Sequence, residues 1–402
     1  MLFAAACIPA DAGLVPDADS VEPMVRVGLV VGDAPLTVGG GNGVLLSSGD
    51  GGGLTPVAAG SSVQVVGGPG GIRLRQSKLG SSGSVSITAR SQETAGFVRI
   101  NGRDYRGEVT VIPVPNGLLA VNVLPLEAYV AGVVNVEMGR RPPSENEAVY
   151  AQAVVSRTFT LRMLGRYRVR GYDVLSTVSD QAYGGVSAET QAGWDAVNKT
   201  RGEVVTYDTQ LAEVYFHSTC GGRTASVEEA FGGAPFPYLR SILDRSPAGE
   251  AYCGSSPRFR WTEQWSGEAA GRTLRETAPL AGANAGSLAQ VSDLQIIRRS
   301  ATNRVSELVI LARQAPAVSV VGEQIIRQVL RPAQVPMLRS ANFSLVVTKA
   351  GGRILSLRAD GSGSGHGVGM CQWGAVGRAR AGASYREILS AYFPGTEVKR
   401  WY

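Results

Sequence analysis

The sequence contains few side chains of the kinds that bind metal ions or act as nucleophiles. Its 402 residues include two histidines, His217 and His366, and four cysteines, Cys7, Cys220, Cys253 and Cys371. No two cysteines form the Cys-x-x-Cys pair that is common in zinc sites. One ligand set can still be assembled for zinc, namely His217, Cys220, His366 and Cys371. The spacing within this set is loose, so we expect no cofactor, and zinc is disfavoured.

Concentrated positive charge and long apolar segments are also missing. The net charge is +6, and no block of Lys and Arg stands out. Because nucleic-acid binding requires a concentrated basic patch, we expect no nucleic-acid partner. No stretch approaches the roughly 20 apolar residues that a membrane-spanning helix needs, which predicts a soluble body. Hydrophobic residues make up 44% of the chain and charged residues 18%, a composition typical of globular proteins.

The first residues resemble the end of an export signal. Leu2-Phe3-Ala4-Ala5-Ala6-Cys7 is apolar, rich in small residues and ends in a cysteine, like a lipoprotein processing site whose upstream part is missing. We therefore expect an exported protein of the periplasm or cell envelope, with Cys7 as the candidate lipidation site. Two cysteines of an exported protein can pair. Cys220 and Cys253 flank one loop-rich stretch and are the expected disulfide.

Glycine is abundant, with 52 residues, and many of these separate short apolar runs near the N-terminus. Residues 1–24 are expected to be a signal remnant and tether. The runs that follow are typical of short strands with turns between them, which predicts a small β-rich domain over residues 25–104. Residues 105–402 form the expected main domain, with about 262–350 as a β-rich insertion or subdomain.

Local signals place several elements of the main domain. Residues 109–112 and 118–123 form the expected hairpin around Pro115-Asn116-Gly117. The first strong helix begins after Pro142-Pro143, with Ser144 as N-cap and Glu147 completing a capping box, and runs to about Leu164. Gln152 lies on the apolar stripe of this helix. A buried amide needs partners, so Gln152 either lines a cleft or bonds the backbone.

Further along, strand and helix patterns alternate. We expect a short helix over 190–197, strands over 203–207 and 214–216, mixed elements over 262–350, and a final helix over 385–392. The predicted fold class is α+β: a mixed, strand-rich catalytic domain with a few helices, preceded by a small β domain.

Both histidines occupy turns rich in glycine and serine. His217 is followed by Ser218-Thr219-Cys220-Gly221-Gly222, and His366 lies between Gly365 and Gly367. Turns at strand ends commonly carry function, so the two side chains are expected to share a site.

Several stretches, in order, resemble the SpoIID/LytB family. The first is Val123–Val134, followed by Glu137-Met138, Ala148–Phe159, Asp180–Gly185 and Thr200–Val205. The later ones are Phe216–Thr224, Tyr238–Ser241, Gly365–Ala375, Tyr385–Leu389 and Tyr392–Thr396. The resemblance covers about residues 105–402, and the strands before it match no family that we can name.

The resemblance implies a lytic transglycosylase of peptidoglycan. Such an enzyme cleaves glycan strands between N-acetylmuramic acid and N-acetylglucosamine and leaves a 1,6-anhydro end. The family's catalytic acid corresponds to Glu137. A carboxyl among apolar side chains suits this role because burial favours its protonated form. The expected substrate-binding residues around it are Gln152, Arg157, Gln181, Tyr183, His217, Ser218, His366 and Gln372, with Tyr183 or Trp373 stacking on a sugar. Arg157 and Trp373 also fit purely structural roles, and Glu127 is expected to be structural.

The alternative function is that of a non-catalytic, wall-binding enhancer of a cell-wall amidase. Expected partners are therefore peptidoglycan glycan strands and, under this alternative, an amidase. We expect general envelope remodelling rather than a sporulation-specific role. Some family members carry metal-ligating Cys and His just before the Gln-x-Tyr motif. Here that stretch, residues 174–180, has neither, which further disfavours zinc.

Overall fold

The structure is a computed structural model that describes residues 21–32, 34–49, 53–68, 71–75 and 86–402. It divides into two compact units. The N-terminal unit ends at Glu213 and also includes Val398–Tyr402, and the C-terminal unit is Val214–Glu397. The expected signal remnant over residues 1–20 and the candidate lipidation site Cys7 lie outside the described residues.

The described residues of the N-terminal unit form three sheets. The seven-stranded sheet has the order β12-β1-β11-β10-β7-β3-β4, with bounds β12 Val174–Leu175, β1 Met24–Gly32, β11 Gly117–Pro125, β10 Glu108–Val114, β7 Ile87–Ser91, β3 Val44–Ser48 and β4 Thr55–Val57. The five-stranded sheet is β6-β5-β2-β8-β9, with bounds β6 Gly71–Arg75, β5 Ser62–Gly68, β2 Leu36–Gly39, β8 Val98–Ile100 and β9 Arg103–Tyr105. The third is β14-β13-β23, with bounds β14 Gln210–Leu211, β13 Glu203–Tyr207 and β23 Glu397–Arg400.

The boundary expected between residues 104 and 105 does not separate the units of this structure. Strand β1 pairs antiparallel with β11 along most of its length, from Met24 opposite Pro125 to Gly32 opposite Leu118. The early strands also share one apolar core with α1 and α2. Because residues before 105 share a sheet and an apolar core with residues after it, they do not form a domain of their own. The hairpin of β10 and β11, by contrast, is confirmed and closes with Val114 opposite Gly117.

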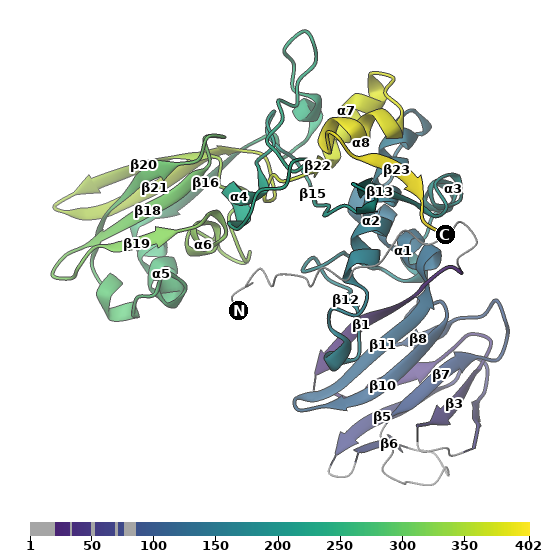
Figure 1. Cartoon of the computed structure of the whole chain (residues 1–402). Helices are drawn as coiled ribbons and strands as arrows, with labels where there is room; N and C mark the ends of the chain where they lie inside the picture. Colours follow the sequence, from purple (N-terminus) through teal and green to yellow (C-terminus); the bar gives the residue numbers. More distant parts are fainter. Residues whose placement is uncertain (1–20, 33, 50–52, 69–70, 76–85) are drawn as a thin grey trace. The chain divides into compact units, whose positions relative to one another are not determined.

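Among its described residues the N-terminal unit also has the α-helices α1 Leu126–Met138, α2 Asn146–Met163 and α3 Gln191–Lys199. In Figure 1, α1 and α2 lie at the end of β11. The start of α2 differs from the prediction. Pro143–Glu145 form a short 3-10 turn, and Glu145 is the N-cap, with no side-chain cap among the described residues. Since the turn already continues into the helix, Ser144 does not take the N-cap position that a capping box requires.

The C-terminal unit contains two three-stranded sheets, a two-stranded one and five helices. The sheets are β16-β21-β20, β17-β18-β19 and β15-β22, with bounds β16 Arg260–Ser266, β21 Arg353–Ser362, β20 Phe343–Ala350, β17 Val291–Arg299, β18 Val305–Ala312, β19 Val318–Val321, β15 Phe216–His217 and β22 Met370–Cys371. The helices are α4 Val227–Phe231, α5 Gly267–Thr277, α6 Glu323–Val329, α7 Gln372–Arg380 and α8 Tyr385–Tyr392. Strands β16–β21 with α5 and α6 enclose a separate apolar core, within the region expected to be β-rich.

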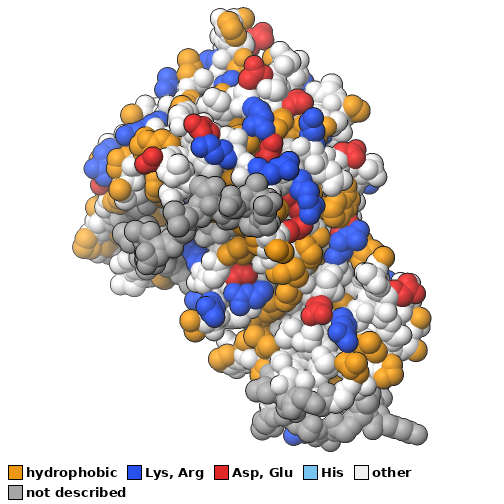
Figure 2. All heavy atoms as spheres, turned by 45° about the vertical axis from the view of Figure 1, so that its right-hand side comes forward, with side chains coloured by type: hydrophobic (Ala, Val, Ile, Leu, Met, Phe, Trp, Pro, Cys, Tyr) orange, Lys and Arg blue, Asp and Glu red, His pale blue; other side chains and the backbone are white. Residues whose placement is uncertain are grey.

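The mixture of helices and sheets confirms the predicted α+β class. The final helix has the predicted bounds, and Ser384 and Glu387 form a capping box at its start. Within the residues that the structure describes, no helix is both long enough and apolar enough to cross a membrane. On the face shown in Figure 2, basic and acidic side chains are interspersed.

Candidate functional site

Glu137 lies in the last turn of α1. Its side chain is partly exposed, and its Oε1 accepts a hydrogen bond of 2.8 Å from the backbone N–H of Ala182. The helix ends one residue later, and Gly139, with a positive φ of 69°, takes the chain out of it. The carboxyl group therefore stands on a rigid element and is oriented by a second segment.

That second segment, Asp180–Tyr183, is held by buried hydrogen bonds. Gln181 accepts from the Tyr129 hydroxyl at 3.1 Å and from the Thr160 hydroxyl at 3.0 Å. The Asp180 carboxyl accepts from the backbone N–H of Leu175 at 2.7 Å, and burial raises its pKa above the ordinary value. Gln181 thus joins α1 to α2 and is fully buried. This position makes it a support for Glu137 rather than a surface for a ligand.

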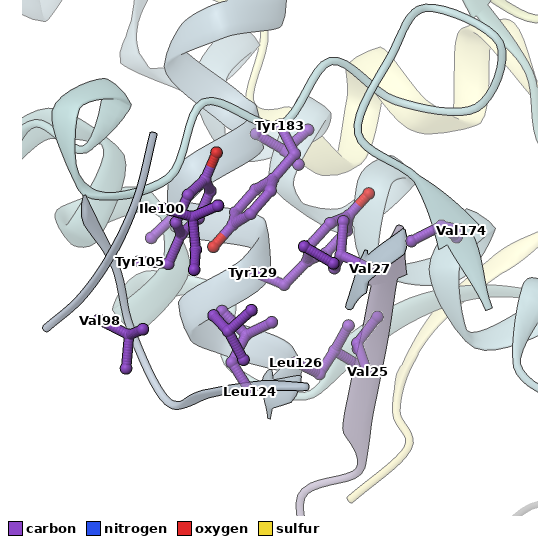
Figure 3. Packing of buried hydrophobic residues seen from close by; sticks show 14 of the residues in the cluster. Val25, Val27, Val98, Ile100, Tyr105, Leu124, Leu126, Tyr129, Val174 and Tyr183 are labelled. Carbon is purple, nitrogen blue, oxygen red and sulfur yellow. The ribbon is translucent and has the colours of Figure 1, made fainter. Parts of the chain in front are cut away.

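Tyr183 lies in the apolar core and not on a sugar-binding surface. Figure 3 shows its ring grouped with those of Tyr129 and Tyr105, with Leu124 and Leu126 below. The ring centroids of Tyr129 and Tyr183 are 5.1 Å apart. The Tyr183 hydroxyl donates to the Asn122 side chain at 2.9 Å. Only 4% of Tyr183 is exposed, so the ring leaves little surface for stacking on a sugar.

Arg157 also has a structural environment. It is fully buried and forms a salt bridge of 2.7 Å with Glu127, which joins α2 to α1. The guanidinium further donates to the Glu203 carbonyl at 2.9 Å, and Glu127 accepts from the Tyr402 hydroxyl at 2.7 Å. Glu127 is therefore structural, as its position in the sequence indicates. Gln152 is likewise fully buried and donates to the Ser156 hydroxyl at 3.0 Å.

The two histidines lie together in the C-terminal unit. Their ring centroids are 5.5 Å apart, because strands β15 and β22 pair in parallel with His217 opposite Cys371. His217 Nδ1 lies 3.1 Å from the Val368 carbonyl oxygen, which makes Nδ1 the protonated nitrogen. Its Nε2 is buried and has no hydrogen-bond partner among the described residues. Burial, with the nearby His366 and Arg304, lowers the pKa of His217 well below its ordinary value.

His366 is held in the complementary way. Its Nε2 donates to the Phe216 carbonyl at 2.9 Å, and its Nδ1 accepts from the Val368 N–H at 3.1 Å. Burial lowers the pKa of His366 to about 3. Both rings are therefore neutral at neutral pH, with at least one nitrogen of each bonded to backbone. This arrangement fixes the two motif loops to each other.

The remaining predicted residues flank these loops. Ser218 is partly exposed and its carbonyl accepts from the Trp373 N–H at 3.1 Å. Trp373 is partly exposed as well, whereas Gln372 is buried at the start of α7. Glu137, Gln152, Arg157, Gln181 and Tyr183 thus belong to the N-terminal unit, and His217, Ser218, His366 and Gln372 to the C-terminal unit. Of the nine residues, Glu137, Ser218 and His366 are partly exposed and the others are buried.

The cysteines of the C-terminal unit form a cluster that the sequence predicted only in part. Cys220 and Cys253 come together as expected, but as free thiols with a distance of 3.5 Å between the sulfur atoms. The expected disulfide is therefore not formed in this structure, because a disulfide requires about 2.05 Å. Cys371 and Asp244 lie in the same cluster. Burial raises the pKa of Cys220 and Cys371, while hydrogen bonds from these two thiols lower that of Cys253 to about 3.

Comparison with known proteins identifies relatives over most of the chain. A family model described as stage II sporulation protein (SpoIID) matches residues 115–207, and one described as a domain of unknown function (DUF8618) matches residues 249–369. The chain is 31% identical to stage II sporulation protein D of Bacillus amyloliquefaciens over 298 residues, which cover 69% of this chain and 75% of that protein. It is 31% identical to an uncharacterised protein of Brachyspira hyodysenteriae over 76% of this chain and 75% of that protein. It is also 25% identical to the amidase enhancer of Bacillus subtilis over 78% of this chain and 47% of that protein.

Proposed function

This chain belongs to the stage II sporulation protein D family, and we propose that it is a lytic transglycosylase of peptidoglycan. It cleaves the bond between N-acetylmuramic acid and N-acetylglucosamine and leaves a 1,6-anhydro end. The observation that supports this proposal is the position of Glu137. Glu137 is a partly exposed residue, its carboxyl is oriented by the Ala182 N–H, and it lies in the stretch that matches the family model.

In the proposed reaction a single carboxyl group serves first as acid and then as base. Protonated Glu137 gives its proton to the glycosidic oxygen, and the bond between this oxygen and C1 of the muramic acid breaks. The 6-hydroxyl of the same sugar forms the new bond to C1, and its proton passes to the Glu137 carboxylate. The protonated enzyme is regenerated, and no water is consumed. Because the nucleophile belongs to the substrate, no second carboxylate is required.

Two backbone groups lie near the Glu137 carboxyl, the end of α1 and the Ala182 N–H. The last turn of α1 is Asn135-Val136-Glu137-Met138, which carries no positive charge. The C-terminal end of a helix bears partial negative charge and disfavours a carboxylate there. The N–H of Ala182 acts in the opposite sense by stabilising the charged form.

The alternative, a non-catalytic enhancer of a cell-wall amidase, has one specific observation in its favour. One relative, which is similar to this chain over 78% of its length, is named amidase enhancer. Under this proposal the chain binds the glycan and an amidase cuts elsewhere. Both functions place the protein outside the cytoplasmic membrane, so we also propose export to the periplasm or cell envelope.

The two functions are distinguished by the products formed from purified peptidoglycan. Wild-type protein, Glu137→Gln and the control Glu108→Gln are incubated separately with peptide-stripped and with intact peptidoglycan. Glu108 is the control because it is an exposed carboxylate on β10 of the same unit. We expect anhydro-ended fragments, identified by mass spectrometry, from wild type and Glu108→Gln but not from Glu137→Gln. Failure of wild type to release fragments from either substrate would favour the enhancer function, which is tested by adding an amidase.

A further inference from the structure

Four side chains from four separate segments of the C-terminal unit meet in its interior. Cys220 follows β15, Asp244 lies in a loop, Cys253 is in the 3-10 helix η4 (Tyr252–Ser255), and Cys371 ends β22. All four are buried, and one ligand atom from each lies within 4.8 Å of every other. Three thiols and a carboxylate are costly to enclose together unless something satisfies them.

The spacing of these atoms suits a tetrahedral metal ion. Four ligand atoms bound at about 2.3 Å to a tetrahedral zinc ion lie roughly 3.8 Å from one another. Here the sulfur atoms of Cys220 and Cys253 are 3.5 Å apart, and Cys220 Sγ is 3.3 Å from Asp244 Oδ2. Small side-chain movements would bring all four atoms to the distances of a zinc site.

Backbone N–H groups around the cluster are arranged to support thiolates. The N–H of Cys220 donates to Cys371 Sγ at 3.1 Å, that of Gly374 to the same sulfur at 3.2 Å, and that of Gly222 to Cys220 Sγ at 3.3 Å. A sulfur needs no such donors to form a disulfide, whereas metal-bound thiolates retain charge that these donors stabilise.

The carboxylate has its own outer partners. Asp244 Oδ2 accepts from the Tyr392 hydroxyl at 2.9 Å, and Oδ1 forms a salt bridge with Arg378 at 3.0 Å. These contacts orient the carboxylate toward the sulfur atoms. Three thiolates and a carboxylate around a divalent ion also leave excess negative charge, which the Arg378 guanidinium partly offsets.

The packing at the start of α7 leaves space for nothing larger than a glycine beside the cluster. A Cβ atom at Gly374 would lie 2.2 Å from Asp244 Oδ2 and 2.1 Å from the Tyr392 hydroxyl oxygen. The start of α7 therefore lies directly against the Asp244 carboxylate, and Cys371 is the N-cap of the helix, whose Sγ accepts from the Gly374 N–H. A disulfide between Cys220 and Cys253 would explain neither this approach nor the presence of Cys371 and Asp244.

We propose that Cys220, Cys253, Cys371 and Asp244 bind one zinc ion in a closed, structural site. The ion's preference for thiolates in a tetrahedral arrangement selects zinc among common divalent metals. Binding releases the thiol protons to solvent. This ligand set differs from the one considered from sequence, since both histidines are bonded to backbone instead. The ion would fix β15 to β22, and with them the loops of His217 and His366. This inference goes beyond the proposed function and does not depend on it.

The test measures metal content and spectra rather than cell-wall activity. Full-length protein is purified without chelators, and zinc per chain is determined by mass spectrometry. We expect one zinc per chain in wild type and in the control Cys7→Ser, and a substantial loss in Cys253→Ser and Asp244→Asn. Replacement of zinc by cobalt in the wild-type chain should give thiolate-to-cobalt charge-transfer absorption together with the visible bands of tetrahedral cobalt. Because the cobalt spectrum is recorded on the wild-type protein, it tests the site even where the Cys253→Ser or Asp244→Asn variant does not fold.

Two results would overturn the zinc site. The first result is that the wild-type protein, with its thiols kept reduced, binds no zinc during incubation with a zinc salt. The other is a Cys220–Cys253 cross-link in the purified protein, detected as a disulfide-linked peptide after digestion. Alkylation of the unfolded protein in the presence of chelator distinguishes a zinc site from a disulfide. The chelator removes the metal, so that thiols that were bound to it react with the alkylating reagent, whereas the cysteines of a disulfide do not.

Discussion

The Glu137 carboxylate accepts its hydrogen bond from the N–H of Ala182, a residue 45 positions further along the chain. The contact joins the end of α1 to the segment that Gln181 and Tyr183 fix in the interior. It places a partly exposed acid on a support whose own members are buried. The reactivity and the stability of this region should therefore respond differently to substitution.

Replacement of Glu137 by Gln should abolish most activity and leave stability nearly unchanged. The amide oxygen of Gln can still accept from Ala182, but the side chain cannot deliver a proton. We expect the rate of anhydro-product formation to fall by about 100-fold or more. Glu137→Ala should lose activity equally and also lose the hydrogen bond, at about 1 kcal/mol of unfolding free energy. Rates are measured by product chromatography and stability by urea unfolding. Full activity in Glu137→Gln would contradict the proposed role.

Arg157→Met should destabilise the protein strongly, because it leaves Glu127 buried without its partner. Both side chains of this salt bridge are almost completely inaccessible, at 0% and 2%. Breaking such a pair costs about 3–5 kcal/mol. The control is Arg99→Met, at an exposed pair with Asp104, for which we expect a change of less than about 1 kcal/mol. Urea unfolding of the two variants measures the difference, and equal effects would refute the structural role of Arg157.

Gly132→Ala should destabilise α1 even though alanine favours helices. A Cβ at residue 132 would lie 2.5 Å from Cε2 of the buried Tyr183 ring. We expect a loss of about 1–3 kcal/mol from overpacking. The matched control is Gly271→Ala in α5, whose Cβ would meet only the mobile end of Arg275, at 3.2 Å. That variant should gain up to about 1 kcal/mol. Thermal unfolding of both variants checks the sign, and stabilisation of Gly132→Ala would contradict the packing of Tyr183.

Glu323 in α6 should contribute to stability in a way that falls with rising pH, opposite in sign to the contribution of the buried His217 and His366. Burial raises the pKa of Glu323 from 4.5 to about 7, although Arg304 lies 3.9 Å away. Between these values the folded protein holds a proton that the unfolded chain has released. The contribution of Glu323 to the free energy of unfolding therefore decreases as pH rises through this window, by about 3 kcal/mol at most. Urea unfolding at several pH values should give a slope of unfolding free energy against pH that is more negative in wild type than in Glu323→Gln, because both proteins share the opposing contribution of His217 and His366. Identical slopes in the two proteins would contradict the prediction.

Elements governed by neighbouring residues were predictable from the sequence. The hairpin of β10 and β11 follows from two apolar runs around Asn116-Gly117, and a final helix was expected over 385–392, where the structure has α8 with a capping box at Ser384 and Glu387. The start of α2 was predicted wrongly. Ser144 was expected to be the N-cap, but Pro143–Glu145 form a 3-10 turn that leads into the helix. The resemblance of residues 105–402 to the family was likewise carried by local motifs, and relatives over 69% and more of the chain support it.

The sequence by itself determined the α+β class, the family and the identity of Glu137 as the candidate acid, since each depends on residues close together in the chain. Tertiary structure decided which motif residues face outward. Gln152, Arg157, Gln181 and Tyr183 have the polar or aromatic character of binding residues, yet long-range packing buries them. It also decided the cysteine cluster, in which Cys220 and Cys371 are 151 residues apart. The sequence indicated that Cys220 and Cys253 lie together, but not that Asp244 joins them, because the four side chains meet only when β15 and β22 pair and the segments of Asp244 and Cys253 pack against these strands.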